Sequence, residues 1–482
     1  MPVSKKQANE TVVAHRTDSG KSTLICEPYW RSGCGRATIY VGDCREIMAK
    51  MDRDQFHAVV TDPPYGLGRE PDVVEVMRSW IKCGYHEVTG GGFMGKQWDA
   101  FVPQPATWQE CVRVMRPGAH MLCFAGTRTL DWMTMALRFV AMEIRDLVMY
   151  CYGSGFPKGN NVDKAIDREL GAKRKQTRTP MSPDGNVWMD KIGADRPWKE
   201  KAKEVGYHEH DSDEPVTEQA RQWQGWNTSL KPALEPIILA RRPFHMTVAQ
   251  CAMENGTGAL NVGACLVGTT GGTVSVGEPN HLNQVYGNDM GGLGIVDAGK
   301  GRWPANLCHD GSDEVVDLFP ESKSSSAVMP LPSTPGQVYG VDHGNTSHAP
   351  TRRGHDDEGS AARFFYTAKA DDDDRPHGKG KHVTTHPTVK PLDLMQYLVR
   401  LVCVRGGTVL DPFMGTGSTG CAAVLEGMRF VGVELSEEYA DLAVGKIKLA
   451  LAQLRPEDSP GLPATVRPAA ATAPAPKKLR GT

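Results

Sequence analysis

The stretch from residue 408 to residue 434 places the strongest limit on what this chain can fold into. Residues 408–411, Thr-Val-Leu-Asp, predict a short buried strand, and the glycine-rich turn at 412–420 then opens a helix. Residues 430–434, Phe-Val-Gly-Val-Glu, predict a second strand that ends in an acid. This order is typical of a βαβ nucleotide-binding unit, in which the glycines let the backbone approach a ligand and the acid, Glu434, binds ribose hydroxyls.

Apolar strands and amphipathic helices also alternate near the start of the chain. Residues from 67 to about 107 predict a long loop, and its glycine triplet at 90–92 suits either a mobile flap or a plain surface loop. Regular structure resumes with a strand at 362–367 and a helix at 392–402. The whole pattern predicts an α/β fold with a largely parallel sheet and helices on both faces. The other predicted strands are 37–43, 56–60, 120–124 and 144–152, and the other predicted helices are 44–51, 107–115 and 130–140.

A stiff polar turn, Thr-Asp-Pro-Pro-Tyr-Gly at 61–66, follows the predicted strand at 56–60. It lies at the carboxyl end of a strand, where open α/β sheets bind ligands. The prolines have no N–H group, so the turn is stiff and its carbonyls are free to accept hydrogen bonds. Asp62 and the Pro63 carbonyl suit the two hydrogens of an exocyclic amine, while Tyr65 suits stacking on a flat base. The same residues also make ordinary turn chemistry, and that alternative stays open here.

Three motifs together resemble those of the DNA amino-methyltransferases, which methylate adenine N6 or cytosine N4. The turn at 62–65 is similar to their catalytic Asp-Pro-Pro-Tyr motif, and Asp-Pro-Phe with Gly-x-Gly at 411–417 is similar to their S-adenosylmethionine loop. The segment 386–391, His-Pro-Thr-Val-Lys-Pro, is similar to the part that meets the methionine end of this cofactor. The resemblance covers about 37–152 and 362–452, while the central segment resembles phage or prophage members only loosely.

The resemblance implies a Rossmann-like methyltransferase fold, circularly permuted because the catalytic motif precedes the cofactor motif. It implies methyl transfer from S-adenosylmethionine to adenine N6 in duplex DNA, by base flipping and in-line transfer, without a metal or a covalent intermediate. Asp at the first motif position favours adenine over cytosine N4. The implied catalytic residues are Asp62, Pro63, Pro64 and Tyr65, and the implied cofactor-binding residues are Asp43, Thr388, Lys390, Asp411, Pro412, Phe413, Gly415, Gly417, Ser418, Thr419 and Glu434.

Other interpretations remain open at this point. Gly415, Gly417 and Gly420 also fit the dinucleotide fingerprint of dehydrogenases. RNA methyltransferases and protein-glutamine methyltransferases share the catalytic motif, and a DNA-binding protein without activity is a further alternative. Asp43 suits either a contact with the adenine ring of the cofactor or a helix cap. Pro391 is also a common residue at the first position of a helix.

Residues 153–360 interrupt the regular pattern, with many Gly, Pro, Ser, Asp, Trp and basic residues and weak periodicity. Basic and aromatic residues in one segment predict a loop-rich target-recognition insertion, although each basic cluster alone also suits a solvated face. The other predicted parts are a flexible N-terminus at 1–22, a catalytic half at 23–152, a cofactor-binding half at 361–455 and a disordered tail at 456–482. The candidate DNA-binding residues are Lys173, Arg174, Lys175, Arg178, Trp198, Arg241 and Arg242.

Composition narrows the compartment and the partners. The net charge is −2, so double-stranded DNA has to be bound by local basic patches. The 12 cysteines include no Cys-x-x-Cys pair, which favours reduced thiols over a zinc site or a disulfide framework. No cysteine follows a proline, which argues against a cytosine C5 methyltransferase. Without a signal peptide or a long apolar run, we expect a cytoplasmic protein of a bacterium or phage-infected cell, with no membrane partner, a possible cognate restriction endonuclease, and a monomeric or homodimeric state.

Overall fold

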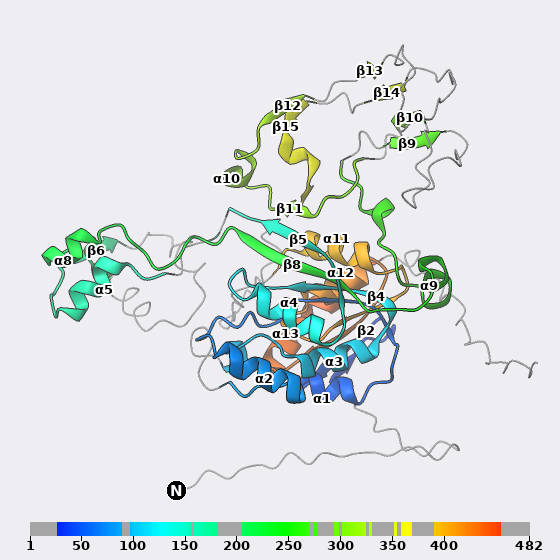
Figure 1. The fold of residues 1–482 in the computed structure, drawn as a ribbon, viewed down its shortest axis with the longest axis horizontal. Coiled ribbons are helices and arrows are strands. Elements are labelled where there is room, and N and C mark those ends of the chain that lie inside the picture. Colours follow the sequence, from blue (N-terminus) through cyan, green and yellow to red (C-terminus); the bar gives the residue numbers. More distant parts are fainter. Residues whose placement is uncertain are drawn as a thin grey trace, which may run out of the picture.

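The computed structural model describes residues 27–88, 97–153, 155, 159–180, 205, 207–268, 273–276, 294–297, 301–323, 327–329, 351–353, 358–368 and 390–454. The core is a ten-stranded sheet in the order β1-β2-β18-β17-β3-β4-β8-β5-β11-β16. Its strands β2, β4, β5, β8 and β11 are labelled in Figure 1. β1 and β8 run antiparallel to their neighbours, and the other strands are parallel to one another. The strands are β1 Trp30–Arg31, β2 Ala37–Val41, β3 Phe56–Thr61, β4 Met115–Phe124, β5 Glu143–Cys151, β8 Leu234–Arg241, β11 Leu307–His309, β16 Tyr366–Thr367, β17 Thr408–Asp411 and β18 Arg429–Glu434.

The first and last parts of the chain share this one sheet. β17, from the C-terminal part, lies between β18 and β3, and its Val409 and Leu410 pair with Ala58 and Val59 of β3. The predicted α/β fold, with a mixed, mostly parallel sheet that joins the first and last parts of the chain, is therefore confirmed.

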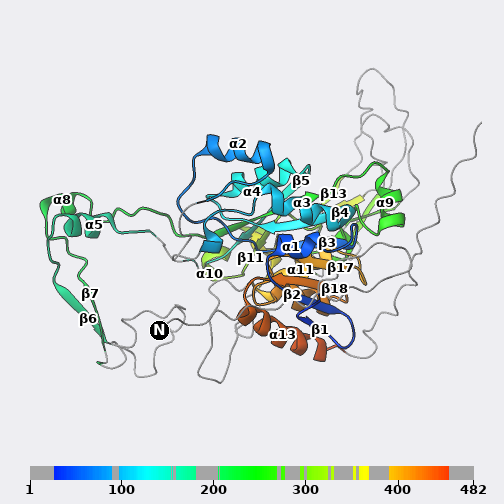
Figure 2. The ribbon, with the colours of Figure 1, turned by 90° about the horizontal axis from the view of Figure 1, so that it is seen from below.

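Successive residues of a strand point to opposite faces of the sheet. Both faces here carry apolar side chains, and helices cover both of them. Val60 and Leu122 belong to the apolar cluster of α11, α12 and α13, whereas the neighbouring Val59 and Met121 belong to the cluster of α1, α2, α3 and α4. Figure 2 shows α2, α3 and α4 on one side of the sheet and α11 and α13 on the other. In the described part of the chain, no helix combines the length and the apolar character needed to cross a bilayer. The helices are α1 Cys44–Ala49, α2 Val73–Cys83, α3 Pro105–Val114, α4 Leu130–Phe139, α11 Leu392–Val402, α12 Ser418–Leu425 and α13 Glu437–Ala452.

Two local predictions were wrong. The segment predicted as a loop up to about 107 contains α2, which begins after the cap Asp72 and buries Trp80. The carboxylate of Asp72 accepts from two backbone N–H groups of the first turn, a signal that the nearby glycines masked. Ala361–Phe364 forms a 3₁₀ helix where the sequence predicts a strand, and only Tyr366–Thr367 pairs in the sheet.

The prediction of one continuous insertion at 153–360 also needs correction. β8 and β11 lie within this range, and both belong to the central sheet. The range therefore divides into excursions at 152–233, 242–306 and 310–365, separated by sheet strands. The second and third excursions contain α9 Val248–Asn255, η3 Val262–Ala264, β9 Thr273–Val276, β10 Gly294–Asp297, α10 Asp313–Val316, β12 Glu321–Lys323, β13 Ala327–Met329, β14 Thr351–Arg353, β15 Glu358–Ser360 and η5 Ala361–Phe364.

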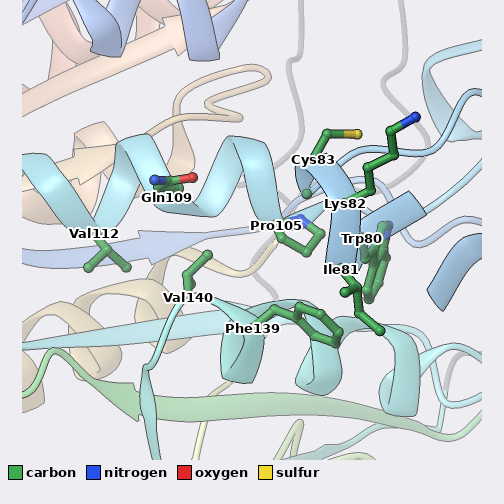
Figure 3. Close-up of a pocket in the computed structure, with 10 residues that line it drawn as sticks. Trp80, Ile81, Lys82, Cys83, Pro105, Gln109, Val112, Phe139 and Val140 are labelled. Carbon is green, nitrogen blue, oxygen red and sulfur yellow. The ribbon is translucent and has the colours of Figure 1, made fainter. Parts of the chain in front are cut away.

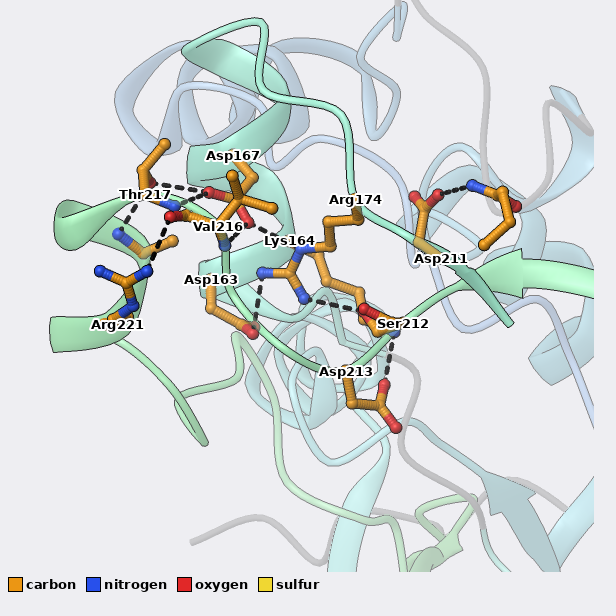
Figure 4. Close-up of polar contacts among 12 residues, drawn as sticks. Asp163, Lys164, Asp167, Arg174, Asp211, Ser212, Asp213, Val216, Thr217 and Arg221 are labelled. Carbon is orange, nitrogen blue, oxygen red and sulfur yellow. Dashed lines mark hydrogen bonds and ion pairs between the residues drawn. The ribbon is translucent and has the colours of Figure 1, made fainter.

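The first excursion forms an arm, defined here as the described residues between 159 and 226, which extends from one side of the core (Figures 1 and 2). Arg174 lies at its centre and binds Asp163 at 3.0 Å and Asp167 at 2.7 Å (Figure 4). Asp167 also accepts from the backbone N–H and the hydroxyl of Thr217, so one carboxylate joins helix α5 to the start of helix α8. The elements of the arm are α5 Val162–Glu169, β6 Gln176–Pro180, β7 Tyr207–Asp211 and α8 Glu218–Gln222.

Candidate active site

The two polar motifs of the sequence meet at the carboxyl edge of the sheet. Asp62 follows β3, and Asp411 ends the neighbouring strand β17. The hydroxyl of Thr61 donates to Asp411 Oδ1 at 2.7 Å, which ties the two strand ends directly together. Segments 350 positions apart in the sequence thus form one site.

Asp411 is a buried acceptor for the turns on either side of it. Its side chain accepts from the hydroxyls of Thr419 at 2.6 Å and Thr61 at 2.7 Å, and from the N–H of Phe413 at 3.1 Å. Burial raises the pKa of Asp411 to about 7, and these three hydrogen bonds offset only part of the effect. The carboxyl group therefore holds the glycine turn against β3 from inside the protein.

The glycine turn is built for close backbone approach. Gly417 has φ +84°, and a Cβ there would lie 2.8 Å from the Cβ of Ala443. Gly415 has φ +54°, but a Cβ there would meet nothing within 4 Å, so this side of the turn faces open space. Pro412 lies at the start of the turn, and Ser418 begins α12 directly after it. No side chain of the described residues caps this helix, so the backbone N–H groups of its first turn are available to a polar ligand.

Glu434 ends β18 beside the glycine turn. Its carboxylate accepts from the N–H of Gly415 at 2.8 Å and from the N–H of Ser436 at 2.9 Å. Burial raises the pKa of Glu434, although these backbone hydrogen bonds act in the opposite direction. The acid thus fixes the turn, and its predicted contact with ribose stays a prediction.

Asp43 caps α1. Its Oδ1 accepts from the backbone N–H of Arg45 at 2.8 Å and of Glu46 at 3.4 Å. The cap that the sequence left open is therefore present. The N–H of Gly42 donates to the carbonyl of Glu434, so Asp43 lies close to the end of β18. The contact of Asp43 with the cofactor stays a prediction.

Lys390 contacts the turn at 62–65, named here the catalytic turn after its predicted role. Its Nζ lies 2.7 Å from Asp62 Oδ2, 3.2 Å from the Tyr65 hydroxyl and 3.4 Å from Glu235 Oε2. Burial alone would lower the pKa of Lys390, but Asp62 and Glu235 outweigh it, and the pKa is raised. Since its charge is balanced here, contact with the cofactor carboxylate stays a prediction, and its proposed partner Thr388 lies outside the described residues.

The catalytic turn is held from several sides. The Tyr65 hydroxyl donates to Asp62 Oδ1 at 2.8 Å, and burial raises the pKa of Tyr65, with Asp62 adding to the effect. The Tyr65 carbonyl accepts from Thr129 at 2.5 Å, and the N–H of Gly66 donates to the buried Asp99 at 3.0 Å. A Cβ on Gly66 would lie 2.7 Å from a backbone nitrogen, so glycine is required there. Pro63 is buried and Pro64 is half-buried within this turn.

Three polar residues of the site were missed in the sequence. Thr61 is the last residue of β3, and Asp99 comes from the glycine-rich segment after the catalytic turn. Glu235 is the second residue of β8, and an acid at the beginning of a strand carries no signal in a parallel sheet. Because β8 is antiparallel, its beginning lies at the same edge as the carboxyl ends of β4 and β5.

Three of the predicted DNA-binding residues form ion pairs within the fold, and their contact with DNA stays a prediction. Arg174 is 7% exposed and serves the ion pairs of the arm. Arg241 pairs with Glu143, and Arg242 with Asp54, at the edge of the sheet opposite the active site. These three guanidinium groups have structural partners within the fold. Lys173, Lys175 and Arg178 are exposed on the arm, Arg178 pairing with Glu209, and Trp198 lies outside the described residues.

A hollow of about 470 Å³ lies between α2, α3 and α4 (Figure 3). Lys82 and Cys83 are the titratable side chains in its lining, and Trp80, Pro105 and Phe139 supply much of its apolar surface. None of its lining residues belongs to the polar cluster around Asp62, so this hollow is separate from the candidate active site.

The family is decided by comparison with known proteins. A model of the DNA methylase family, with adenine-N6 and cytosine-N4 members, matches residues 56–445. This chain belongs to that family. The N6/N4 DNA methylases depend on S-adenosylmethionine, and this chain shares the turns at 62–65 and 411–417 that carried the resemblance.

Individual relatives match this DNA methylase over short stretches. The type II methyltransferase M.ScaI of Streptomyces caespitosus is 35% identical over 65 residues, 14% of this chain and 21% of its own length. The DNA adenine methyltransferase YhdJ of Escherichia coli K12 is also 35% identical over 65 residues, 14% of this chain and 22% of its own length. The chain therefore matches only about a fifth of the length of these two relatives.

Solved structures resemble this DNA methylase over most of its length at low identity. The PvuII DNA methyltransferase, cytosine-N4-specific, aligns with 87% of this chain and 88% of its own, at 10% identity and a TM-score of 0.39. M1.HpyAVI in complex with S-adenosylmethionine aligns with 85% of this chain and 99% of its own, at 13% identity and a TM-score of 0.31.

Proposed function

We propose that this DNA methylase transfers a methyl group from S-adenosylmethionine to the N6 amine of adenine in duplex DNA. One observation carries the proposal: the acid that suits the target amine, Asp62, lies directly beside the end of the cofactor strand, Asp411, through the bond between Thr61 and Asp411. In-line transfer needs the amine and the methyl donor in one pocket, and this contact supports such a pocket. Cytosine N4 is the second candidate, because the DNA methylase family has members of both specificities.

The glycine turn suits S-adenosylmethionine. The backbone at Gly415 borders open space, Glu434 ends the next strand, and α12 begins at Ser418, which are the features that hold the ribose and the polar end of a nucleoside. Asp411, Pro412, Phe413, Gly417, Thr419 and Asp43 complete this proposed cofactor site, with Lys390 and Thr388 toward the methionine end. When bound, the cofactor supplies an electrophilic methyl group on a positively charged sulfur.

The residues of the catalytic turn orient the target base. Asp62 and the Pro63 carbonyl accept hydrogen bonds from the exocyclic amine, which favours a nitrogen lone pair directed out of the ring conjugation. Tyr65 offers its ring to the flipped base, and Pro64 keeps the turn rigid. Since the amine of a paired base is inaccessible, the base leaves the duplex before it reaches this edge of the sheet.

Duplex DNA is the proposed partner, and the arm is the proposed recognition element. Its exposed Lys173, Lys175 and Arg178 suit phosphate contacts. Acidic side chains slightly outnumber basic ones among the described residues of the arm, so recognition by shape and polar contacts outweighs a general basic field. A cognate restriction endonuclease and a monomeric or homodimeric state remain part of the proposal.

The test is methyl transfer to defined DNA. The protein is incubated with cofactor labelled in the methyl group and with duplex DNA, and the DNA is digested to nucleosides. Label in N6-methyl-2′-deoxyadenosine supports the proposal, and label only in N4-methyl-2′-deoxycytidine selects the second candidate. Competition with RNA and with protein substrates excludes other acceptors, and absence of label in any nucleic acid contradicts the proposal.

A matched variant tests the role of the acid. Asp62→Ala removes the acceptor for the amine but leaves the glycine turn intact. We expect loss of methyl transfer with cofactor binding retained, measured by calorimetry. Retained turnover in Asp62→Ala contradicts the proposed role.

A further inference from the structure

Three neighbouring strands, β3, β4 and β8, each place one side chain on the same face of the sheet, at the edge that holds Asp62. Asp62 follows β3, Phe124 ends β4, and Glu235 is near the beginning of β8. Phe124 belongs to the apolar cluster on the α11 side, and Lys390, two residues before α11, projects its ammonium 4.9 Å from the centre of the Phe124 ring. Lys390 therefore spans from one carboxylate to the other across an aromatic ring.

The span is unequal. Nζ of Lys390 lies 2.7 Å from Asp62 but 3.4 Å from Glu235. The Lys390 side chain is 7% exposed, and the Glu235 side chain is 20% exposed, so water screens this cluster only weakly. Two carboxylates share one ammonium, and the pKa of Lys390 is raised despite its burial, because both acids favour the charged form.

In this arrangement both oxygens of Asp62 are engaged. Oδ1 accepts from the Tyr65 hydroxyl at 2.8 Å, and Oδ2 accepts from Lys390 at 2.7 Å. Each carboxylate oxygen can accept a second hydrogen bond, but the target amine needs a lone pair that is aimed at it, and a looser hold of the ammonium on Asp62 frees Oδ2 for this contact. A buried ammonium leaves one carboxylate readily only when a second one receives it, because an unpaired charge in this setting is costly.

We propose that Glu235 is a positioning residue of the methylase, which draws the Lys390 ammonium away from Asp62 so that Asp62 binds the target amine. The proposal rests on the proposed function of this site. Glu235 acts through Lys390 and does not itself touch the base. Phe124 provides the surface over which the ammonium moves, since an aromatic face attracts a cation along the path.

The first test is Glu235→Gln, which keeps the size of the side chain and removes its charge. Lys390 then stays with Asp62, and we expect kcat for methyl transfer to fall about 100-fold, the effect of a misplaced reacting group. The affinity for cofactor and the KM for DNA stay close to wild type, because the glycine turn and the arm are unchanged. Glu143→Gln is the matched control, since Glu143 begins β5 at the opposite edge, and it should retain the wild-type kcat.

The second test is a double-mutant cycle with Lys390→Met. Because Glu235 acts through Lys390, Glu235→Gln causes no further loss of kcat in the Lys390→Met background. Glu235→Asp keeps the charge and should recover part of the activity, as expected for a positioning role of the carboxylate. Thermal unfolding of each variant shows whether a loss of activity comes from a loss of folding. The inference is overturned if Glu235→Gln keeps the wild-type kcat, or if its loss is equal in both backgrounds. A wild-type protein without transfer to any nucleic acid instead contradicts the proposed function itself.

Discussion

Substitution of Asp411 by Asn tests the balance of forces at the centre of the site. Asp411 is 2% exposed and accepts from Thr61, Thr419 and the backbone of Phe413. Burial raises its pKa to about 7 in the folded protein, whereas the carboxyl of an unfolded chain has a pKa of about 3.9. Asn has nearly the same shape and can still accept, but it carries no titrating proton.

The sign of the effect follows from which state binds the proton. Between about pH 4 and about pH 7, the folded wild type keeps a proton on Asp411 that the unfolded chain has released. The free energy of unfolding therefore contains a contribution that is complete below about pH 4 and is lost as the pH rises to about 7. A difference of about three pKa units corresponds to about 4 kcal/mol.

Urea unfolding of the wild type and of Asp411→Asn, from about pH 4 to about pH 8, measures this contribution. Other groups titrate equally in the two proteins, so the difference isolates Asp411. We expect the variant to gain about 4 kcal/mol on the wild type across this range. A difference that does not change with pH would refute the reasoning, and a reversed slope would mean that the three hydrogen bonds outweigh burial.

Other substitutions test single contacts. Gly417→Ala should destabilise the protein by about 1–3 kcal/mol and weaken cofactor binding, because residue 417 has a positive φ and the new Cβ contacts α13. Gly415→Ala meets open space, so only the strain of its positive φ should destabilise the protein. Thermal unfolding compares the two variants. Thr61→Val leaves a buried carboxyl oxygen without one donor and should cost about 1–3 kcal/mol in urea unfolding. Arg241→Ala and Arg242→Ala, at the opposite edge, should leave DNA affinity in a fluorescence anisotropy assay close to wild type, although stability falls; a large loss of affinity would contradict our placement of the DNA.

The central strands were predicted well because each is specified by residues within the strand and the turn that follows it. The apolar run before Asp62 forms β3, and the βαβ unit from 408 to 434 forms β17, α12 and β18. Ser436 caps α13, and its side chain accepts from the backbone N–H of Tyr439. In these segments the apolar residue period and the helix cap indicate the same structure, so tertiary contacts did not need to decide the outcome.

The positions of several charged residues could not be predicted, because strand direction and partner choice are not local. Arg241 and Arg242 resembled a basic patch in the sequence, but the antiparallel direction of β8 carries them to the edge away from the site. The same reversal carries Glu235 into the site. Arg174 resembled a surface cation until Asp163, from the helix before it, turned out to face it.

The direction of β8 also determines which excursion can reach the target base. β5 ends at Cys151 and β8 begins at Leu234, both at the carboxyl edge, so the arm leaves and rejoins the core beside Glu235. β8 ends at Arg241 on the other edge, where the excursion at 242–306 begins and from which β11 sets out again. One reversed strand therefore gives the site its second carboxylate and roots the arm next to it. On this topology, we expect DNA contacts near a flipped base to come from the arm and from the excursion that follows β11, since both start at the edge that holds Asp62.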